Sequence, residues 1–581
     1  MYKKLAQSIK EYKKPSIVTP ILVTGEVLLE CIIPFITASL VNQIKAGCGL
    51  DVISKYSIVL VIMAFFSLAF GTLAGKTCAT ASCGLAKNLR KDMFDNIQTF
   101  SFENIDRFSA ASLVTRLTTD VTNVQNAYMM IIRIAVRCPL MFLFAFIMAF
   151  VMGGRMAVIF LFVVPFLGLA LYLILRKVMP LFRRVFKKYD ALNNSVQENV
   201  KGMRVVKAYV REDHEKQKFD AAAESVCVDF TKAEKILALT HPAMQFCLYA
   251  VMVFVLYFGS YTIITTRGID LDVGQFSSLL TYSFMILSSL MMLSMVFVMI
   301  TMAQESAKRI IEVLDEGSSL ADPEDPVMTV ENGAVDFDGV SFKYSEKAER
   351  MALANIDLHI RSGETIGIVG GTGSSKSTLV QLIPRLYDTV EGIVHVGGRD
   401  VREYSLETLR NAVAVVLQKN VLFSGTIAEN LRWGNPDATD EELAEACRLA
   451  RADEFIQQFP DGYDTYIEQG GANVSGGQKQ RLCIARALLK KPKILILDDS
   501  TSAVDTRTDA EIRKALHAYI PETTKIIIAQ RVTSVMDADR IVVMEGGGIL
   551  AVGSHDELME SCDIYREIYI SQNKAGDFDE Q

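Results

Sequence analysis

Six long apolar stretches in the first half of the chain constrain its fold more than any other feature. A lipid bilayer has a hydrocarbon core about 30 Å thick, which a helix of roughly 20 apolar residues can cross. Only helices and closed barrels satisfy their backbone hydrogen bonds there. We therefore expect six membrane helices, followed by a soluble half in which strand and helix patterns alternate. The predicted spans cover residues 17–43, 57–75, 127–152, 156–176, 242–265 and 276–303.

Basic side chains predict how these spans are oriented. Five lysines precede the first span, so residues 1–15 are expected to form an amphipathic elbow helix on the cytoplasmic membrane surface. Residues 176–188 contain six basic side chains and no acidic one, which favours the same side. The long connections 76–126 and 177–241 should therefore extend the membrane helices into the cytoplasm. The lysines are Lys3, Lys4, Lys10, Lys13 and Lys14.

Each long connection is expected to turn over at a short crossing helix, near residues 104–112 and 202–211. Such a helix could contact a soluble domain, and a helix pair that contacts nothing is the alternative. After the last span, a polar segment ends in DPEDP and is typical of a linker. The predicted parts are the elbow 1–15, a transmembrane domain 16–303, a linker 304–326, a soluble domain 327–571 and a polar tail 572–581.

Charged residues also occur inside two predicted spans. Glu26 and Glu30 lie one helical turn apart in the first span, and Arg133 and Arg137 do so in the third. Charges are costly in lipid and should face the interior of the bundle. They either pair with one another or line a translocation pathway, and the sequence leaves both readings open.

Composition excludes several classes of function. The net charge is only -7 and no basic tract is present, so we expect no nucleic-acid partner. The 10 cysteines form no CxxC pair, and histidines are not clustered at the spacing of metal ligands. Neither a disulfide framework nor a zinc site is indicated.

A glycine-rich turn in the soluble half predicts a phosphate-binding loop. Its backbone N–H groups should surround a phosphate at the start of a helix, where Lys376 reaches the terminal phosphates and Ser377 binds Mg²⁺. Ser375 stands where a glycine usually precedes the lysine, so it must adopt a backbone shape that glycine adopts more easily. A loop that binds nothing is the alternative. The candidate residues are Gly370, Gly371, Thr372, Gly373, Ser374, Ser375, Lys376, Ser377 and Thr378.

Further candidate residues flank this loop along the chain. Tyr344 ends a predicted strand upstream, where an adenine could stack on it. Gln418 ends a β-branched strand and could reach Mg²⁺ or water. ILILDD predicts a buried strand that ends at Asp498, a Mg²⁺ ligand through water, and Asp499, placed as a general base. Gln530 ends a further strand.

A second glycine-rich turn, VSGGQ, precedes another predicted helix and offers backbone donors and a hydroxyl to a phosphate. It comprises Val474, Ser475, Gly476, Gly477 and Gln478.

Together, GGTGSSKST, Gln418, VSGGQ, ILILDD, SAVD and the six spans resemble an ATP-binding cassette (ABC) exporter over nearly the whole chain. The resemblance implies an all-α six-helix transmembrane domain of the type I exporter fold, fused to a P-loop α/β nucleotide-binding domain. It implies ATP and Mg²⁺ as cofactors. VSGGQ then stands at the signature motif, SAVD (Ser502 to Asp505) at the D-loop and Tyr344 at the adenine-stacking aromatic, while the two turn-overs match the coupling helices.

Two residues depart from the pattern of this family. Asp499 stands at the position where the family has its catalytic glutamate, and Gln530 stands at the position of the switch histidine. A carboxylate shortened by one methylene withdraws by about 1.5 Å, and glutamine cannot carry a proton. We therefore expect an ATP site that binds nucleotide but hydrolyses it slowly.

The resemblance then implies a heterodimer with a second ABC half-transporter. The intact signature motif of this chain would complete the ATP site of that partner. A homodimeric exporter and a non-transporting membrane ATP sensor are the alternatives. The expected location is the cytoplasmic membrane, in contact with lipids, and the expected cargo is a small amphiphilic drug, peptide or lipid. The sequence does not select among these cargoes.

Overall fold

The structure, a computed structural model, describes residues 2–345, 348–499 and 504–576. The chain divides into two compact units, and each is described by itself. The first contains Met1–Gln98 and Ala110–Glu316, and the second contains Thr99–Ser109 and Gly317–Gln581.

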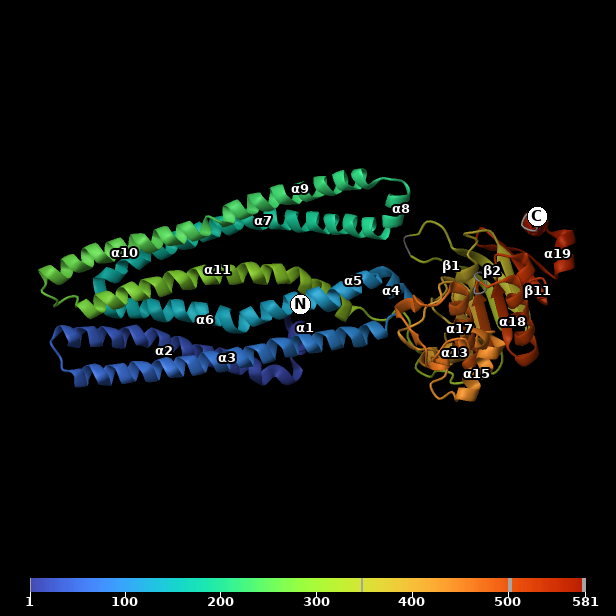
Figure 1. Cartoon of the computed structure of the whole chain (residues 1–581), viewed down its shortest axis with the longest axis horizontal. Coiled ribbons are helices and arrows are strands. Elements are labelled where there is room, and N and C mark those ends of the chain that lie inside the picture. The colour runs from blue at the N-terminus through green and yellow to red at the C-terminus, as the bar shows by residue number, and fades with distance from the viewer. Residues whose placement is uncertain (1, 346–347, 500–503, 577–581) are drawn as a thin grey trace. The chain divides into compact units, whose positions relative to one another are not determined.

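The first unit is a bundle of long helices that run side by side (Figure 1). Five helical stretches are long and apolar enough to cross a membrane. One of them, Ala110–Phe182, contains both the third and the fourth predicted span, because a 3-10 turn that begins at Gly154 (φ 49°) reverses the chain there without ending the helical run. The helical elements are α1 Tyr2–Gln7, η1 Lys10–Tyr12, α2 Lys13–Lys45, α3 Leu50–Gln98, α5 Ala110–Thr115, η2 Arg116–Asp120, α6 Val121–Gly153, η3 Gly154–Val158, α7 Ile159–Lys201, α8 Met203–Ala208, α9 Glu212–Leu237, α10 Thr240–Thr265 and α11 Val273–Asp315.

Small residues hold these helices close together. Ala74, Ala145 and Ala149 are fully buried in the core of the bundle, and small side chains are what allow helix backbones to approach in lipid. At the start of α11, a Cβ added to Gly274 would lie 2.0 Å from the carbonyl oxygen of Ala38 on α2. Glycine is therefore required at this crossing.

Two boundaries differ from the sequence-based expectation. The N-terminal segment is not one helix, because the backbone is left-handed at Lys10 (φ 42°), where η1 begins after a break from α1. Ser8 donates a 2.8 Å hydrogen bond to Asp92 of α3, and Lys10 pairs with the same carboxylate. The segment thus packs on the extension of the second span.

The predicted linker is also shorter than expected, because α11 continues to Asp315. Its last turns are held by α3 and by η2, a five-residue π-helix. Arg116 of η2 lies 2.9 Å from Glu312, and the amide of Asn96 on α3 donates to the carbonyl of Val313 over 2.7 Å. These contacts accompany the continuation of the helix beyond the predicted span 276–303.

The two turn-overs of the long connections are both short helices, α4 Phe102–Phe108 and α8 Met203–Ala208. They belong to different units, since Thr99–Ser109 groups with the soluble half. Near α8, Val205, Tyr209 and Val210 are 60%, 74% and 80% exposed.

The second unit contains a six-stranded sheet in the order β12-β11-β3-β10-β9-β6 and a four-stranded antiparallel sheet in the order β2-β1-β4-β5. In the larger sheet only β12 pairs antiparallel. The strands are β1 Val335–Phe342, β2 Leu353–Ile360, β3 Thr365–Gly370, β4 Glu391–Val396, β5 Arg399–Asp400, β6 Val413–Val416, β7 Gly425–Thr426, β8 Tyr466–Ile467, β9 Ile494–Asp498, β10 Thr524–Ile528, β11 Arg540–Glu545 and β12 Gly548–Gly553.

Helices cover this larger sheet, and its parallel strands are mostly apolar and buried, as expected of strands covered on both faces. All five residues of β9 are buried. The elements are α12 Lys376–Gln381, α13 Leu406–Ala412, α14 Ile427–Arg432, α15 Asp440–Leu449, α16 Asp453–Ile456, η4 Gly462–Asp464, η5 Gln469–Gly471, α17 Gly476–Leu489, α18 Thr506–Tyr519, η6 Val532–Ser534, α19 His555–Ser561 and α20 Asp563–Gly576.

Candidate functional site

Four neighbouring parallel strands bring most of the predicted site residues to one edge of the large sheet. β3, β10, β9 and β6 end at Gly370, Ile528, Asp498 and Val416. The loops that follow these ends carry the glycine-rich turn, Gln530, the paired aspartates and Gln418. In open α/β sheets, ligands bind in the crevice outside the carboxyl ends of the strands.

The glycine-rich turn between β3 and α12 depends on backbone shapes that few side chains tolerate. A Cβ at Gly370 would lie 2.2 Å from the carbonyl oxygen of Met544, and Gly373 has a φ of 84°. Ser375, the N-cap of α12, adopts the left-handed conformation (φ 67°, ψ 25°) that the sequence analysis anticipated. A non-glycine residue there costs on the order of 1–3 kcal/mol, so the turn is strained.

The Lys376 amine lies inside this turn. It donates hydrogen bonds to the carbonyls of Gly370 (2.8 Å) and Gly371 (2.9 Å) and to the hydroxyl of Ser374 (3.3 Å). Burial lowers the pKa of Lys376, although two nearby carboxylates oppose this shift. A cation that is costly to bury, with three neutral acceptors around it, would gain from contact with a phosphate anion.

Ser377 and Asp498 meet beside the lysine. The Ser377 hydroxyl donates to Asp498 Oδ1 over 3.0 Å, and burial raises the pKa of Asp498. Mg²⁺ is typically held by one or two carboxylates together with waters and phosphate oxygens. One carboxylate and one hydroxyl at this edge fit that donor set.

Asp499 follows strand β9 and also has a left-handed backbone (φ 49°). Its Oδ2 accepts hydrogen bonds from the amides of Gln530 (2.8 Å) and Gln418 (3.4 Å). Burial raises the pKa of the Asp499 carboxyl. Sequence reasoning placed Gln418 with Mg²⁺, whereas the structure turns its amide to Asp499.

Sequence reasoning missed Gln572, a residue of the predicted polar tail that the structure places in α20. Its amide donates to the carbonyl of Gln530 over 2.8 Å and accepts from the N–H of Val532 over 2.8 Å. Both bonds bracket the loop that carries Gln530. No motif signals this role, because the contact joins segments that are 40 residues or more apart.

Tyr344 lies beside the same turn. Its hydroxyl is 2.9 Å from the hydroxyl of Thr378 and donates to Gln381 Oε1 at 3.4 Å, both on α12. The side chain is 46% exposed. It is therefore held next to the glycine-rich turn and retains open surface.

The second glycine-rich turn forms the N-terminus of α17. Ser475 is the N-cap, and its hydroxyl accepts from the N–H of Gln478 (3.2 Å), while the Gln478 side chain accepts from the N–H of Ser475 (2.9 Å). The Ser475 hydroxyl keeps its own proton to donate. Ser475 and Gly476 are exposed, so this helix terminus is open to an anion.

The SAVD segment is only partly described. Ser502 and Ala503 lie outside the described residues. Val504 is buried, and Asp505 caps α18 by accepting from the N–H of Thr508 over 2.9 Å.

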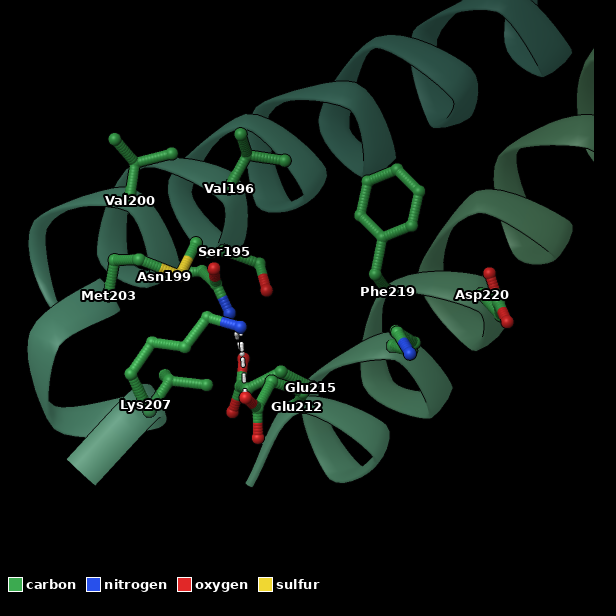
Figure 2. Close-up of a pocket in the computed structure, with 12 residues that line it drawn as sticks. Ser195, Val196, Asn199, Val200, Met203, Lys207, Glu212, Glu215, Phe219 and Asp220 are labelled. Carbon is green, nitrogen blue, oxygen red and sulfur yellow. Dashed lines mark hydrogen bonds and ion pairs between the residues drawn. The ribbon is translucent and has the colours of Figure 1, made fainter. Parts of the chain in front are cut away.

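A separate hollow of about 580 Å³ lies in the first unit, where α7 and α9 meet near α8 (Figure 2). Val196, Val200 and Phe219 give it an apolar lining, and Lys207 pairs with Glu212 over 3.0 Å. This hollow contains none of the predicted nucleotide-site residues.

The membrane charges form an ion cluster. Arg137 of α6 lies 2.6 Å from Glu26 and 2.8 Å from Glu30, both on α2. The expected pairing is thus present for Arg137, whereas Arg133 makes no ion pair within the described part of the chain. Glu26 is 7% exposed and its Oε2 has no hydrogen-bond partner among the described residues.

Two glycines of α3 make room for these charges. A Cβ at Gly71 would lie 2.9 Å from Glu26 Oε1, and one at Gly75 would lie 3.6 Å from the guanidinium of Arg133. Small residues spaced by four usually bring membrane helices together. Here the same spacing accepts charged side chains from α2 and α6.

Comparison with known proteins identifies the family to which the chain is similar. The model of the ABC transporter transmembrane region matches residues 17–301, and the ABC transporter model matches residues 353–502. The chain is similar over 97% of both lengths, at 36% identity, to an uncharacterized ABC transporter ATP-binding protein, YfiB, of Bacillus subtilis.

Other similar proteins agree with this match. A Bacillus subtilis protein provisionally named a multidrug export ATP-binding/permease protein, YgaD, is 30% identical over 98% of this chain and 99% of its own. Among solved structures, a bacterial Atm1-family ABC exporter with ATP bound matches 97% of this chain and 98% of its own, with a TM-score of 0.82 and 25% identity.

Proposed function

This chain belongs to the ABC transporters and has the exporter fold, and from that premise we propose that it is the degenerate-site half of a heterodimeric exporter. Its own site binds ATP and Mg²⁺ but hydrolyses slowly. Its signature turn completes the competent site of a second ABC half-transporter. The heterodimer moves a small amphiphilic substrate, which can be a drug, a peptide or a lipid, out across the cytoplasmic membrane.

One observation carries this proposal: Asp499, which by the family resemblance stands where the catalytic glutamate is expected, accepts a hydrogen bond at Oδ2 from the Gln530 amide over 2.8 Å. A base must come within about 2.6–3.2 Å of the attacking water, and a side chain shorter by one methylene withdraws by about 1.5 Å. The raised pKa of Asp499 favours proton acceptance, but only for a water within reach.

Glutamine at position 530 removes a second contribution to catalysis, the one that a histidine would make. An amide neither gains a proton nor carries positive charge towards the γ-phosphate. Loss of a placed transition-state donor costs on the order of 10²–10³ in rate, and loss of a general base costs roughly 10²–10⁴. Slow turnover at this site follows from either loss.

Retention of nucleotide is supported by the rest of the site. Lys376, Ser377 and Asp498 lie together at the edge of the sheet, with Tyr344 beside α12. In the family, nucleotide domains dimerise head to tail, so each ATP lies between the phosphate-binding loop of one chain and the signature turn of the other. The open turn at Ser475 is accordingly assigned to ATP held by the partner.

The test compares the full chain alone with the chain co-expressed with a half-transporter that has Glu and His at the two altered positions. We expect the chain alone to retain bound ATP and to hydrolyse at least about 10²-fold more slowly than the pair. In the pair, Asp499→Asn should change turnover little, because the carboxylate is already out of reach.

Two outcomes would replace the proposal. If the chain alone hydrolyses as fast as the pair and Asp499→Asn abolishes that activity, the protein is a homodimeric exporter with a working aspartate base. If the pair hydrolyses ATP but inverted membrane vesicles take up no candidate amphiphile, the result favours a membrane ATP sensor that does not transport.

A further inference from the structure

Two charged groups of the membrane helices are left over when the others have paired. Arg137 of α6 donates through Nη1 to Glu26 Oε1 over 2.6 Å and through Nη2 to both oxygens of Glu30 over 2.8 Å. Among the described residues, Glu26 Oε2 then has no hydrogen-bond partner, and Arg133 makes neither an ion pair nor a side-chain hydrogen bond. The cluster therefore keeps one free acceptor and one free cation.

Both free groups lie against one face of α3, at positions that carry no side chain. A Cβ at Gly71 would lie 3.7 Å from Glu26 Oε2, and a Cβ at Gly75 would lie 3.6 Å from Arg133 Nη1. The Cβ positions of residues four apart on a helix are about 5–6 Å from each other. The acceptor and the cation thus lie on neighbouring turns of the same helix face.

The cluster is buried unevenly. The side chains of Arg137 and Glu30 are 29% and 26% exposed, and Arg133 is half-buried. Glu26 is the most buried member, with 7% of its surface exposed. A polar group that enters the cluster can contact Arg133 and extend towards the free oxygen of Glu26.

An ionisable residue inside a membrane span that lacks a partner in its own chain points to a ligand, because such charges are costly in lipid. We propose that Arg133 and Glu26 bind a head group that carries both an anionic group and an ammonium group. Arg133 contacts the phosphate or carboxylate through its paired N–H groups, and Glu26 Oε2 accepts a hydrogen bond from the ammonium.

This head-group chemistry has two sources, an exported amphiphile and a phospholipid of the surrounding bilayer. For an exported amphiphile, the inference rests on the proposed function and names its substrate class. The site itself depends only on contacts among α2, α3 and α6. It is therefore independent of the partner chain and of where ATP is hydrolysed.

A direct pair between Arg133 and Glu26 is the competing arrangement. It would satisfy both groups without a ligand, but the two form no ion pair in the described part of the chain, although Arg137 leaves Glu26 Oε2 free. The two arrangements differ in what Arg133 does for the protein without ligand. A paired Arg133 stabilises the fold, whereas a ligand-binding Arg133 stabilises only the complex.

The experiment uses two lysophospholipids that have the same acyl chain. Lysophosphatidylethanolamine has a phosphate and an ammonium with N–H donors, whereas the quaternary ammonium of lysophosphatidylcholine has no N–H. Native mass spectrometry of the full chain counts the bound lipid over a concentration series. We expect one saturable molecule of lysophosphatidylethanolamine per chain. Lysophosphatidylcholine should bind about threefold more weakly or worse, because it cannot donate a hydrogen bond to Glu26.

Arg133→Gln removes the cation and should weaken binding of lysophosphatidylethanolamine by about tenfold or more, since charge-assisted hydrogen bonds are the strong ones. Without lipid, this variant should unfold at the same temperature as the unaltered chain. Arg133→Lys keeps the charge but not the paired donors, and should recover part of the affinity. Arg176→Gln, at an exposed arginine of α7, is the matched control and should bind the lipid as the unaltered chain does.

ATP-dependent uptake assigns the source of the ligand. In inverted vesicles that contain the chain and its half-transporter partner, uptake of labelled lysophosphatidylethanolamine that needs both Mg-ATP and Arg133 identifies an exported amphiphile. A lipid that binds at Arg133 but is not moved identifies a resident bilayer lipid. Both results support the head-group site. Failure of the pair to hydrolyse ATP would overturn the proposed function and leave the binding result unchanged, so the two failures are distinguishable.

Three binding results would overturn the inference: no saturable binding, equal affinity for the two lipids, or unchanged affinity in Arg133→Gln. A lower unfolding temperature of Arg133→Gln without lipid would also overturn it, in favour of the direct pair with Glu26.

Discussion

The two glycine-rich turns of the second unit look alike in sequence but differ in structure. The loop 370–378 forces Ser375 into a left-handed conformation (φ 67°), whereas the turn 474–478 gives Ser475 an extended backbone (φ -68°) and a complete capping box. In the proposed function, the first turn serves a site whose base, Asp499, is too short. The second is regular and open. In the proposed heterodimer, the chain would therefore offer a regular signature turn to its partner while its own site carries the shortened base.

The largest effect is expected at the regular turn. Ser475→Arg should lower ATP turnover of the heterodimer by at least about 10²-fold. It removes a hydrogen-bond donor and places a bulky side chain where the turn must close on ATP held by the partner. ATP held by this chain should remain bound. The measurement is ATPase activity with nucleotide occupancy. Ser554→Arg, which alters the N-cap of the capping box of α19, is the control and should keep turnover. Intact turnover in Ser475→Arg would remove the contrast between the turns.

A gain of ATP hydrolysis tests the site that contains the loop 370–378. Asp499→Glu combined with Gln530→His restores the length of the base and a protonatable partner. In a heterodimer whose other base has been neutralised, this double variant should raise hydrolysis by on the order of 10²-fold. Each single variant should do less, since the base and its partner act together. An unchanged rate would mean that the loop 370–378 itself limits this site.

Lys376→Ala addresses binding rather than chemistry. It removes the partly buried cation of the strained turn, so nucleotide retention by this chain should fall by about tenfold or more, because a charge-assisted bond contributes roughly 1.5–3 kcal/mol. Much of the heterodimer's turnover should persist. Photolabelling of each subunit gives the readout, and Lys491→Ala, an exposed lysine paired with Glu442, is the control. Equal labelling of Lys376→Ala and the unaltered chain would contradict the assignment.

The smallest effect is expected from Ser375→Gly. Glycine adopts positive φ without the steric cost that serine incurs, which stabilises the folded variant. Glycine also gains conformational entropy in the unfolded chain, so the net increase in the free energy of unfolding should be about 1 kcal/mol or less. Thermal unfolding measures this change. Loss of stability would show that the serine side chain makes a compensating contact.

The sequence predicted the fold class because it depends on local patterns, whereas the roles given to the site residues stay predictions. Apolar runs define α2 and α11, and strands of β-branched residues end where the site residues begin. The sequence did not predict that Gln418 turns to Asp499, or that Gln572 brackets the Gln530 loop. Those contacts join distant segments through single polar side chains, which leave no periodic signal.

Helix ends were predicted less well for a related reason. The polar residues after Ala303 resemble a linker, yet α11 continues to Asp315 because Arg116 and Asn96 bind its last turns. Likewise, the sequence treats 104–112 and 202–211 as equivalent turn-overs. Only the first groups with the soluble half, through side chains such as Asp106 that pair with a partner far along the chain.

The Glu26–Arg137–Glu30 cluster imposes an order on biogenesis. Arg137 follows Glu26 by 111 residues and Glu30 by 107. At a synthesis rate of about 5–20 residues per second, the first span waits about 5–20 s for its cation. During that time two acidic side chains sit in a helix that lacks their counter-charge, and a buried charge in a nascent span costs roughly 2.5–3.5 kcal/mol. Retention of the first span during synthesis therefore rests on its apolar residues until the third span brings the counter-charge.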